Sequence, residues 1–183
     1  MPLCFASDRA LDMIPNVTLR PEEPQDYQTI HDLTCDAVAP MPFADGSEAG
    51  SIDAMRKAGD LTMSFVAVTD HIVGHVAFSA ARISGAEGLW FALGPISIEA
   101  GFQRKGIGTM MAKAGLTELA KMGAEGCVLL GNPAVYNPMG FVSDGRLTFG
   151  SLNTDYIMYH SLTGAIPTGE ITFVDALQAD YRP

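Results

Sequence analysis

The chain has 183 residues, which is the usual size of a single domain and short for two. Hydrophobic residues make up 48% of it and charged residues only 17%, so the composition excludes a disordered chain. Eleven Lys and Arg stand against 21 Asp and Glu, a formal net charge of −10. This balance argues against a general nucleic-acid binder, because such a protein needs a basic face.

Three widely spaced cysteines, Cys4, Cys35 and Cys127, form neither a CxxC pair nor a His/Cys cluster with zinc spacing. We therefore expect reduced thiols, no metal site and a cytoplasmic protein. The N-terminal residues lack the basic start and apolar run of a signal peptide. The uncharged stretch over 126–143 is about long enough to span a bilayer. Its glycines, prolines and asparagines predict a buried strand and a loop instead.

The N-terminal third of the chain predicts an arm, a strand and two helices. Residues 1–15 show no hydrophobic period and are expected to form a loose arm. A short strand over 16–20 precedes a first helix over 24–38. A loop rich in proline separates it from a second helix over 47–58, which Gly59 closes.

The middle of the chain predicts β structure. Two runs rich in β-forming residues, 61–69 and 72–82, flank a turn and should form an antiparallel hairpin. A third strand over 89–98 is interrupted by Gly94-Pro95. Proline cannot donate to a strand ladder, so this pair implies a bulge or a parting from the neighbouring strand.

A strand–helix–strand unit follows. A helix over 106–122 carries apolar residues at i, i+3, i+4 and i+7 and ends at Gly123. The next strand, 127–130, is apolar throughout, as expected of a strand covered on both faces. Together these elements predict a right-handed βαβ unit with two parallel strands. Further strands are expected at 141–142, 156–162 and 171–174.

The segment PISIEAGFQRKGIGT, residues 95–109, is the most informative for chemistry. Backbone N–H groups at a helix N-terminus, with glycines that allow close approach, form a cradle for an anion. Arg104 and Lys105 add positive charge, so a diphosphate is the natural ligand. The P-loop motif is absent, and a dinucleotide-binding fold would need GxGxxG near the start of a βαβ repeat. Only one βαβ unit is predicted here, after several antiparallel strands.

The wider pattern resembles the GNAT superfamily of N-acetyltransferases. The motif Q-x-x-G-x-G at 103–108 follows a strand and opens a long helix, and Y-x-x-x-G-F at 136–141 follows the next strand. Within the superfamily, LGPISIEAGFQRKGIG and GCVLLGNPAVYNPMGF are similar to the bacterial YhbS-like branch of predicted acetyltransferases. The likeness covers about 17–162, most of the chain.

The resemblance implies a mixed α/β fold, that of the acyl-CoA N-acyltransferases. Helices cover both faces of a twisted mixed sheet, and the two central parallel strands, 89–98 and 127–130, splay apart like a V. Gly94-Pro95 lies where that parting should begin. The expected organisation is an N-terminal arm over 1–15, an N-acetyltransferase domain over 16–164 and a C-terminal tail over 165–183 packed on the domain.

The resemblance also implies a reaction and a co-substrate. The motif at 103–108 would hold the pyrophosphate of acetyl-CoA, and the pantetheine arm would pair with the backbone at 96–98. A neutral amine would attack the thioester, form a tetrahedral oxyanion and expel the coenzyme A thiolate. The residues expected to bind acetyl-CoA are Ile96, Ser97, Ile98, Gln103, Arg104, Lys105, Gly106, Ile107, Gly108, Thr109, Asn132 and Tyr136.

The catalytic groups are less evident. Family members place a tyrosine four residues before the glycine against the sulfur, so Tyr136 is the expected general acid. The helix that would carry Tyr136 is shorter than in many members, and Pro138 breaks it again. No general base stands out, and a water chain to bulk solvent could serve instead. The residues considered as bases are Glu99, Glu87, His75 and His31.

Several functions are compatible with the sequence. The leading one is an acetyl-CoA-dependent N-acetyltransferase acting on a primary amine of a small molecule or protein. An acyl-CoA-binding regulatory or interaction module that has lost turnover is the alternative, and a nucleotide-binding protein is a third. The sequence does not identify the acceptor amine. Neither nucleic acid nor membrane is expected as a partner, and the resemblance allows a homodimer.

Overall fold

The computed structural model describes residues 16–40 and 46–180. The predicted arm over 1–15 and part of the predicted loop, 41–45, lie outside the described residues. The strands are β1 (Thr18–Pro21), β2 (Leu61–Val68), β3 (Ile72–Ile83), β4 (Trp90–Ile98), β5 (Gly126–Leu130), β6 (Leu147–Thr148), β7 (Ile157–Ser161) and β8 (Gly169–Phe173). The α-helices are α1 (Tyr27–Val38), α2 (Glu48–Ala58), α3 (Ile107–Lys121), α4 (Pro133–Tyr136) and α5 (Asp175–Asp180), and short 3-10 turns include η4 (Asn137–Met139).

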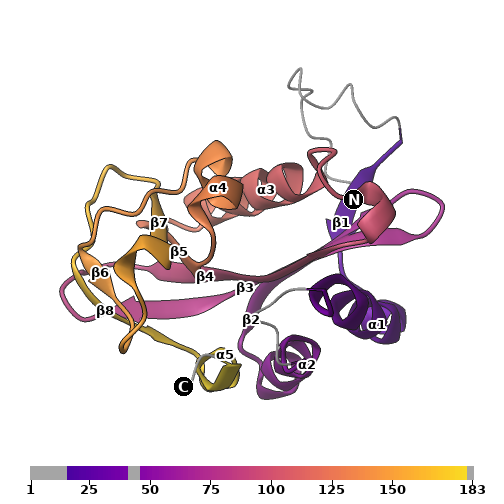
Figure 1. The fold of residues 1–183 in the computed structure, drawn as a ribbon, viewed down its shortest axis with the longest axis horizontal. Helices are drawn as coiled ribbons and strands as arrows, with labels where there is room; N and C mark the ends of the chain where they lie inside the picture. Colours follow the sequence, from indigo (N-terminus) through magenta and orange to yellow (C-terminus); the bar gives the residue numbers. More distant parts are fainter. Residues whose placement is uncertain (1–15, 41–45, 181–183) are drawn as a thin grey trace.

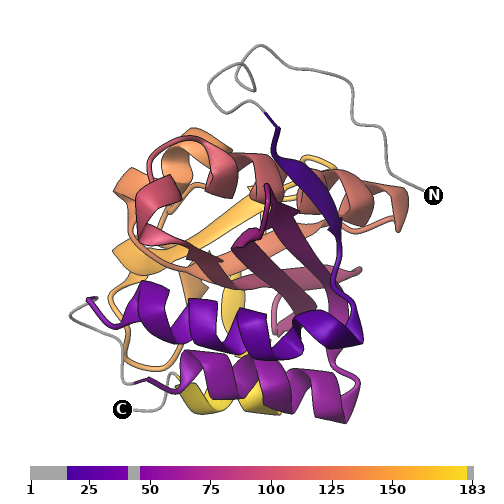
Figure 2. The ribbon, with the colours of Figure 1, turned by 90° about the vertical axis from the view of Figure 1, so that its right-hand side faces the viewer.

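A single mixed sheet separates two helical layers. Helices α3 and α4 lie on one face, and α1, α2 and α5 lie on the other (Figure 1). Figure 2 shows α1 and α2 side by side beneath the sheet, where they contact each other. The predicted mixed α/β architecture is therefore confirmed. Within the described ranges, no helix has both the length and the apolar character needed to cross a membrane.

The two central parallel strands diverge as predicted. The main path of the sheet runs β1-β2-β3-β4-β5-β7, and β4 pairs in parallel with β5. This pairing covers only Trp90 to Ala92 of β4, opposite 126–128 of β5. Beyond Ala92, β4 continues to Ile98 along β3 alone, with a register irregularity opposite Gly94-Pro95. The V therefore opens after Ala92, shortly before Gly94-Pro95, where the sequence predicted the parting to begin.

Two hydrophobic cores occupy the two faces. The first joins α3 to the sheet, and Gly115 lies so close to the Phe78 ring that an added Cβ would overlap it. This close approach explains a glycine inside a 15-residue helix, where it otherwise lowers helix propensity. The second core packs α1, α2 and α5 against the other face, around residues such as Ile52 and Trp90.

The end of the chain departs most from the predicted elements. Residues 141–142 form no strand, because only a single bridge joins Val142 to Tyr159 of β7. The tail pairs β8 with the end of β3 and then forms α5 against α2. The strand predicted over 171–174 is thus confirmed as β8, which begins two residues earlier than predicted. The sequence did not predict β6 or α5. Each is six residues or shorter, too short for a periodic pattern.

Candidate functional site

The N-terminus of α3 offers unpaired backbone donors. Gly106 takes the N-cap position with a left-handed φ of 88°, which favours glycine, and no side chain caps the helix. The N–H groups of Ile107, Gly108 and Thr109 therefore lack the intrahelical acceptors that later turns have. Such a terminus attracts anions through its N–H groups and the helix dipole.

Gly108 brings this helix terminus close to the open part of β4. A Cβ added to Gly108 would lie 3.7 Å from Ile96 Cδ1, 3.8 Å from Met139 Cε and 4.0 Å from Ile98 Cγ1. These are ordinary contacts, so a methyl group would fit but a longer side chain would have to displace its neighbours. The backbone of the first helical turn is consequently left accessible beside the diverging strand.

Side chains of the loop tie the end of β4 to the helix. The Gln103 amide Nε2 donates to the Ile98 carbonyl oxygen at 3.0 Å, which fixes the turn between strand and helix. The Lys105 ammonium lies 5.3 Å from the centroid of the Phe102 ring. Arg104 adopts a left-handed φ of 59° and is exposed. The loop thus presents two cations beside the unpaired backbone donors.

The predicted pantetheine segment, 96–98, shows alternating side-chain directions. Ile96 and Ile98 pack against the core on the α3 face. Ser97 is buried on the opposite face, where its hydroxyl donates to Thr34 Oγ1 of α1 at 3.2 Å. Ser97 therefore contributes its backbone to the V, while its side chain serves the packing of α1.

Tyr136 is held beside the end of β5 by its neighbours. Its ring lies over Gly131, where an added Cβ would overlap the aromatic carbons, and it meets the Phe141 ring edge-on at 6.1 Å. Gly140 has a left-handed φ of 89°, and an added Cβ would lie 2.9 Å from His160 Nδ1. The Y-x-x-x-G-F spacing thereby sets the ring position. Burial raises the pKa of Tyr136 to about 12, so the phenol is protonated at neutral pH.

Asn132 begins the short helix that carries Tyr136. Its side-chain oxygen accepts a hydrogen bond from the Ala134 N–H at 2.9 Å, which is an N-cap. Helix α4 covers one turn, as the sequence predicts, and continues as η4 at Pro138. A cavity of about 420 Å³ adjoins this region and is lined by Asn132, Pro133, Asn137, Ser143, Asp155 and Tyr156.

The structure separates the residues considered as bases. Glu99 follows the end of β4 and accepts from His71 Nε2 at 2.6 Å, on the surface beside the helix terminus. Glu87 is exposed in the loop before β4, at the opposite end of that strand. His31 lies on α1 and pairs with Asp53 of α2 at 2.7 Å. None of these three side chains is brought together with Tyr136.

His75 is the fourth residue considered, and it belongs to a polar cluster that the sequence did not indicate. Its side chain is 0% exposed, and its Nε2 lies 2.8 Å from Ser64 Oγ. Ser64 donates to the Glu22 carboxylate at 2.6 Å, and Arg56 donates to the same carboxylate at 2.8 and 3.0 Å. Glu22 directly follows β1, and the other three residues come from β2, β3 and α2, so no local motif could reveal the cluster.

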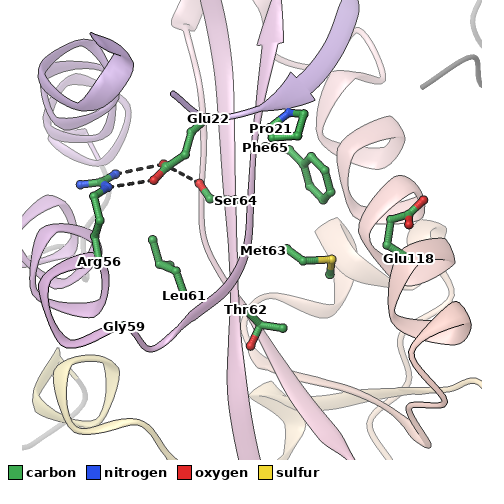
Figure 3. A pocket seen from close by; sticks show the side chains of 10 residues that line it. All are labelled: Pro21, Glu22, Arg56, Gly59, Leu61, Thr62, Met63, Ser64, Phe65 and Glu118. Carbon is green, nitrogen blue, oxygen red and sulfur yellow. Dashed lines mark hydrogen bonds and ion pairs between the residues drawn. The ribbon is translucent and has the colours of Figure 1, made fainter. Parts of the chain in front are cut away.

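A cavity of about 570 Å³ lies beside this cluster, at the edge of β2 that β1 leaves uncovered. Figure 3 shows Glu22 reaching towards both Arg56 and Ser64 at its wall. Burial alone would raise the pKa of Glu22. Hydrogen bonds from His75, Arg56 and Ser64 outweigh that effect and lower the pKa to about 2, so Glu22 is a carboxylate at neutral pH.

Comparison with known proteins places the chain in a family. A model of the acetyltransferase (GNAT) family matches residues 27–141. The uncharacterized N-acetyltransferase YhbS of Escherichia coli strain K12 is 31% identical over 108 residues, 58% of this chain; the chain spans 65% of the length of this curated relative. A GNAT family acetyltransferase from Brucella melitensis, solved in complex with acetyl-CoA, is 34% identical with a TM-score of 0.77, covering 88% of this chain and 98% of that one.

A second solved structure supports the fold. Escherichia coli YhbS, solved in complex with CoA, has a TM-score of 0.79 and 24% identity, covering 94% of this chain and 96% of that one. The family model spans more than half of the sequence, and its matched segment contains the V, the uncapped helix terminus and Tyr136. The protein therefore belongs to the GNAT family of acetyltransferases.

Proposed function

We propose that the protein transfers an acetyl group from acetyl-CoA to the primary amine of a small molecule or protein. The observation that carries the proposal is the uncapped N-terminus of α3, packed through Gly108 against the diverging half of β4. This arrangement supplies backbone donors for a diphosphate next to unpaired strand edges for an extended arm. The Brucella relative, solved with acetyl-CoA, supports the same ligand.

Individual roles follow from the positions of the side chains. The first turn of α3 would bind the diphosphate, with Arg104 and Lys105 adding charge. The backbone of 96–98 would pair with the pantetheine arm, because β4 has no strand partner on that side. Asn132 uses its side-chain oxygen in the cap, which leaves its amide N–H groups to donate to the arm.

The reaction would proceed by direct attack. The amine nitrogen attacks the thioester carbonyl carbon, the carbon–sulfur bond breaks, and the electron pair leaves on sulfur. Tyr136 donates its phenolic proton to that sulfur, and the proton that the nitrogen loses as it becomes an amide restores the phenol. Burial disfavours the phenolate, so the phenol keeps its proton until a thiolate forms beside it. A backbone N–H near Ile98 would donate to the oxyanion.

A single-turnover assay tests the proposal. Enzyme in excess over radiolabelled acetyl-CoA is mixed with separate amines: a polyamine, an aminoglycoside, an amino acid and a lysine-containing peptide. We expect label to reach at least one of these classes faster than it reaches water. Tight binding of acetyl-CoA with no transfer to any amine would instead favour the acyl-CoA-binding module.

A further inference from the structure

The face of the sheet beneath α1 carries an unusual line of buried polar side chains. His75 and Ser79 lie on the same face of β3, two positions before and two positions after Ala77. Ser97 of β4 lies opposite His75, and Ser64 of β2 lies opposite Ala77. His75, Ser79 and Ser97 are at most 1% exposed. Buried polar atoms are nearly always hydrogen-bonded, so each exception calls for a physical reason.

One such exception is His75 Nδ1, which has no hydrogen-bond partner among the described residues. The hydrogen bonds on the other side of the ring define its state. Because Glu22 is a carboxylate, the Ser64 hydroxyl donates to it. Ser64 Oγ must then accept from His75, so Nε2 carries the hydrogen and Nδ1 keeps a free lone pair. Nδ1 of the buried ring is thus a proton acceptor in a defined position.

The register indicates which strands lie beside His75. Ser64 lies beside Ala77, on the β2 side and towards the carboxyl end of β3. The two ring nitrogens of histidine point in different directions, so Nδ1 faces away from Ser64. On β4, Gly74 pairs with Ile98 and His75 with Ser97, in the segment that lines the V. The strand that the proposed reaction uses is therefore the neighbour of His75 on the side away from β2 and Ser64.

The proposed reaction needs a base at this place. The acceptor enters mainly as an ammonium ion, whose nitrogen has no lone pair until one N–H bond breaks. The sulfur takes up one proton when the carbon–sulfur bond breaks, so one further proton must be released in each turnover. We propose, resting on the function proposed above, that His75 accepts the proton of the amine at Nδ1, through a water molecule, and that Glu22 stabilises the resulting imidazolium through Ser64.

The surrounding charges suit this role. Burial lowers the pKa of His75, which keeps the ring neutral and able to accept a proton, while Glu22 opposes that effect. Arg56 of α2 also disfavours the protonated ring, but its charge is directed at Glu22. The arrangement of carboxylate, hydroxyl and imidazole fixes one tautomer, as the third member of a catalytic triad does. His75 is accordingly a proton-relay residue, because α1 covers it and it acts through water.

The first experiment needs no substrate. Nitrogen-15 NMR of the imidazole rings in the full chain distinguishes a protonated from a free ring nitrogen. We expect His75 to show a protonated Nε2 and a free Nδ1 at pH 7.5, and Ser64→Ala to mix the tautomers. Ser79→Ala, a matched change on the same face, should leave the spectrum of His75 unchanged. A His75 ring that carries its hydrogen on Nδ1 would overturn the proposal.

The second experiment separates proton removal from structure. His75→Gln keeps an amide donor towards Ser64 but cannot take up a proton. Single-turnover transfer is measured with ethylamine, which is protonated at pH 7.5, and with 2,2,2-trifluoroethylamine, which is largely neutral. We expect the single-turnover rate of the variant to fall roughly 100-fold with ethylamine and less than about 3-fold with the neutral amine. General base assistance typically accelerates a reaction by about 10²–10⁴-fold.

Equal losses with both amines, or no loss with either, would overturn the role of His75. Rates with ethylamine should also recover in the variant as the pH rises and the amine becomes neutral, which a packing defect would not produce. If wild-type protein transfers acetyl groups to no amine, the proposed function fails. In that case the tautomer measured by NMR still decides whether Nδ1 is a free base.

Discussion

The two faces of the sheet carry charge in different ways. On the α3 face, the site rests on backbone N–H groups, glycines and apolar side chains, with Arg104 and Lys105 adding positive charge. On the α1 face, charged side chains are numerous but neutralise one another, as in the pairing of Arg56 with Glu22 and Asp53. An acidic protein can thus present one locally positive surface to an anionic ligand by means of helix geometry.

The comparison has a physical consequence. Backbone dipoles at a helix terminus cannot be titrated or removed by truncating a side chain, so the α3 face should be insensitive to pH and sensitive to steric blocks. The α1 face depends on ionised groups and should respond to pH and to charge removal.

The largest effect should come from Gly108→Glu. The new side chain must displace Ile96 or Met139 and brings a negative charge to the anion cradle. Losing one charge-assisted hydrogen bond costs about 1.5–3 kcal/mol, and repulsion adds to it, so acetyl-CoA affinity should fall by at least ~100-fold. Titration calorimetry measures the loss. Gly50→Glu, on the exposed side of α2 with open space around it, is the matched control and should bind normally.

Tyr136→Phe should lower kcat by about 100-fold, the low end of general acid catalysis, and leave acetyl-CoA affinity nearly unchanged. The ring keeps its contacts with Gly131 and Phe141, and only the proton donor is lost. Val135→Ala, on the exposed side of the same turn, is the control. A phenylalanine variant with wild-type kcat, when chemistry limits turnover, would assign Tyr136 to packing.

On the α1 face, Glu22→Gln should change the pH dependence of stability. The folded pKa of about 2 lies below the ordinary value of 4.5, so the unfolded chain binds the proton more readily. This stabilisation, up to about 3 kcal/mol, is complete above pH 4.5 and is lost as the pH falls towards 2. Denaturant unfolding of wild type and variant should therefore differ by about 3 kcal/mol at pH 7 and converge near pH 2.

Glu87→Gln is the control for that series, since Glu87 is exposed and its side chain forms no hydrogen bond within the described ranges. Its unfolding free energy should follow that of the wild type at every pH. A gap between wild type and Glu22→Gln that stays constant from pH 7 to pH 2 would show that the Glu22 carboxylate contributes through packing alone.

The two faces also differ in how far the sequence predicts them. The α3 side is local in sequence: strand, turn and helix are contiguous, so the motif at 103–108 and the break at Gly94-Pro95 indicated both the helix terminus and the V. The spacing of Tyr136 from Gly140 likewise reflects a real constraint, the close approach of His160. Its assignment as general acid stays a prediction.

The α1 side depends on contacts between distant segments. Glu22 and His75 are 53 positions apart, and each looks unremarkable in its own segment of the sequence. Only the register of three strands and the placement of α2 bring Ser64 and Arg56 to the same carboxylate. Buried polar clusters of this kind have no periodic or motif signal, whereas hydrophobic periodicity does predict the helices that cover them.

The smallest effect should come from Lys105→Ala, because backbone donors carry most of the binding on the α3 face. Lys105 forms no ion pair with a described residue, and its ammonium rests near the Phe102 ring, so it is free to approach a phosphate. A charge-assisted hydrogen bond contributes about 1.5–3 kcal/mol at most, and exposure to solvent reduces this, so we expect roughly a 10-fold loss of coenzyme A affinity.

The loss of affinity in Lys105→Ala should shrink as salt is raised from low to physiological concentrations. Repeating the titration with dephospho-coenzyme A identifies the contact: a smaller loss with that ligand places Lys105 at the 3′-phosphate, and an equal loss places it at the diphosphate. A loss as large as that of Gly108→Glu would contradict the dominance of backbone donors on this face.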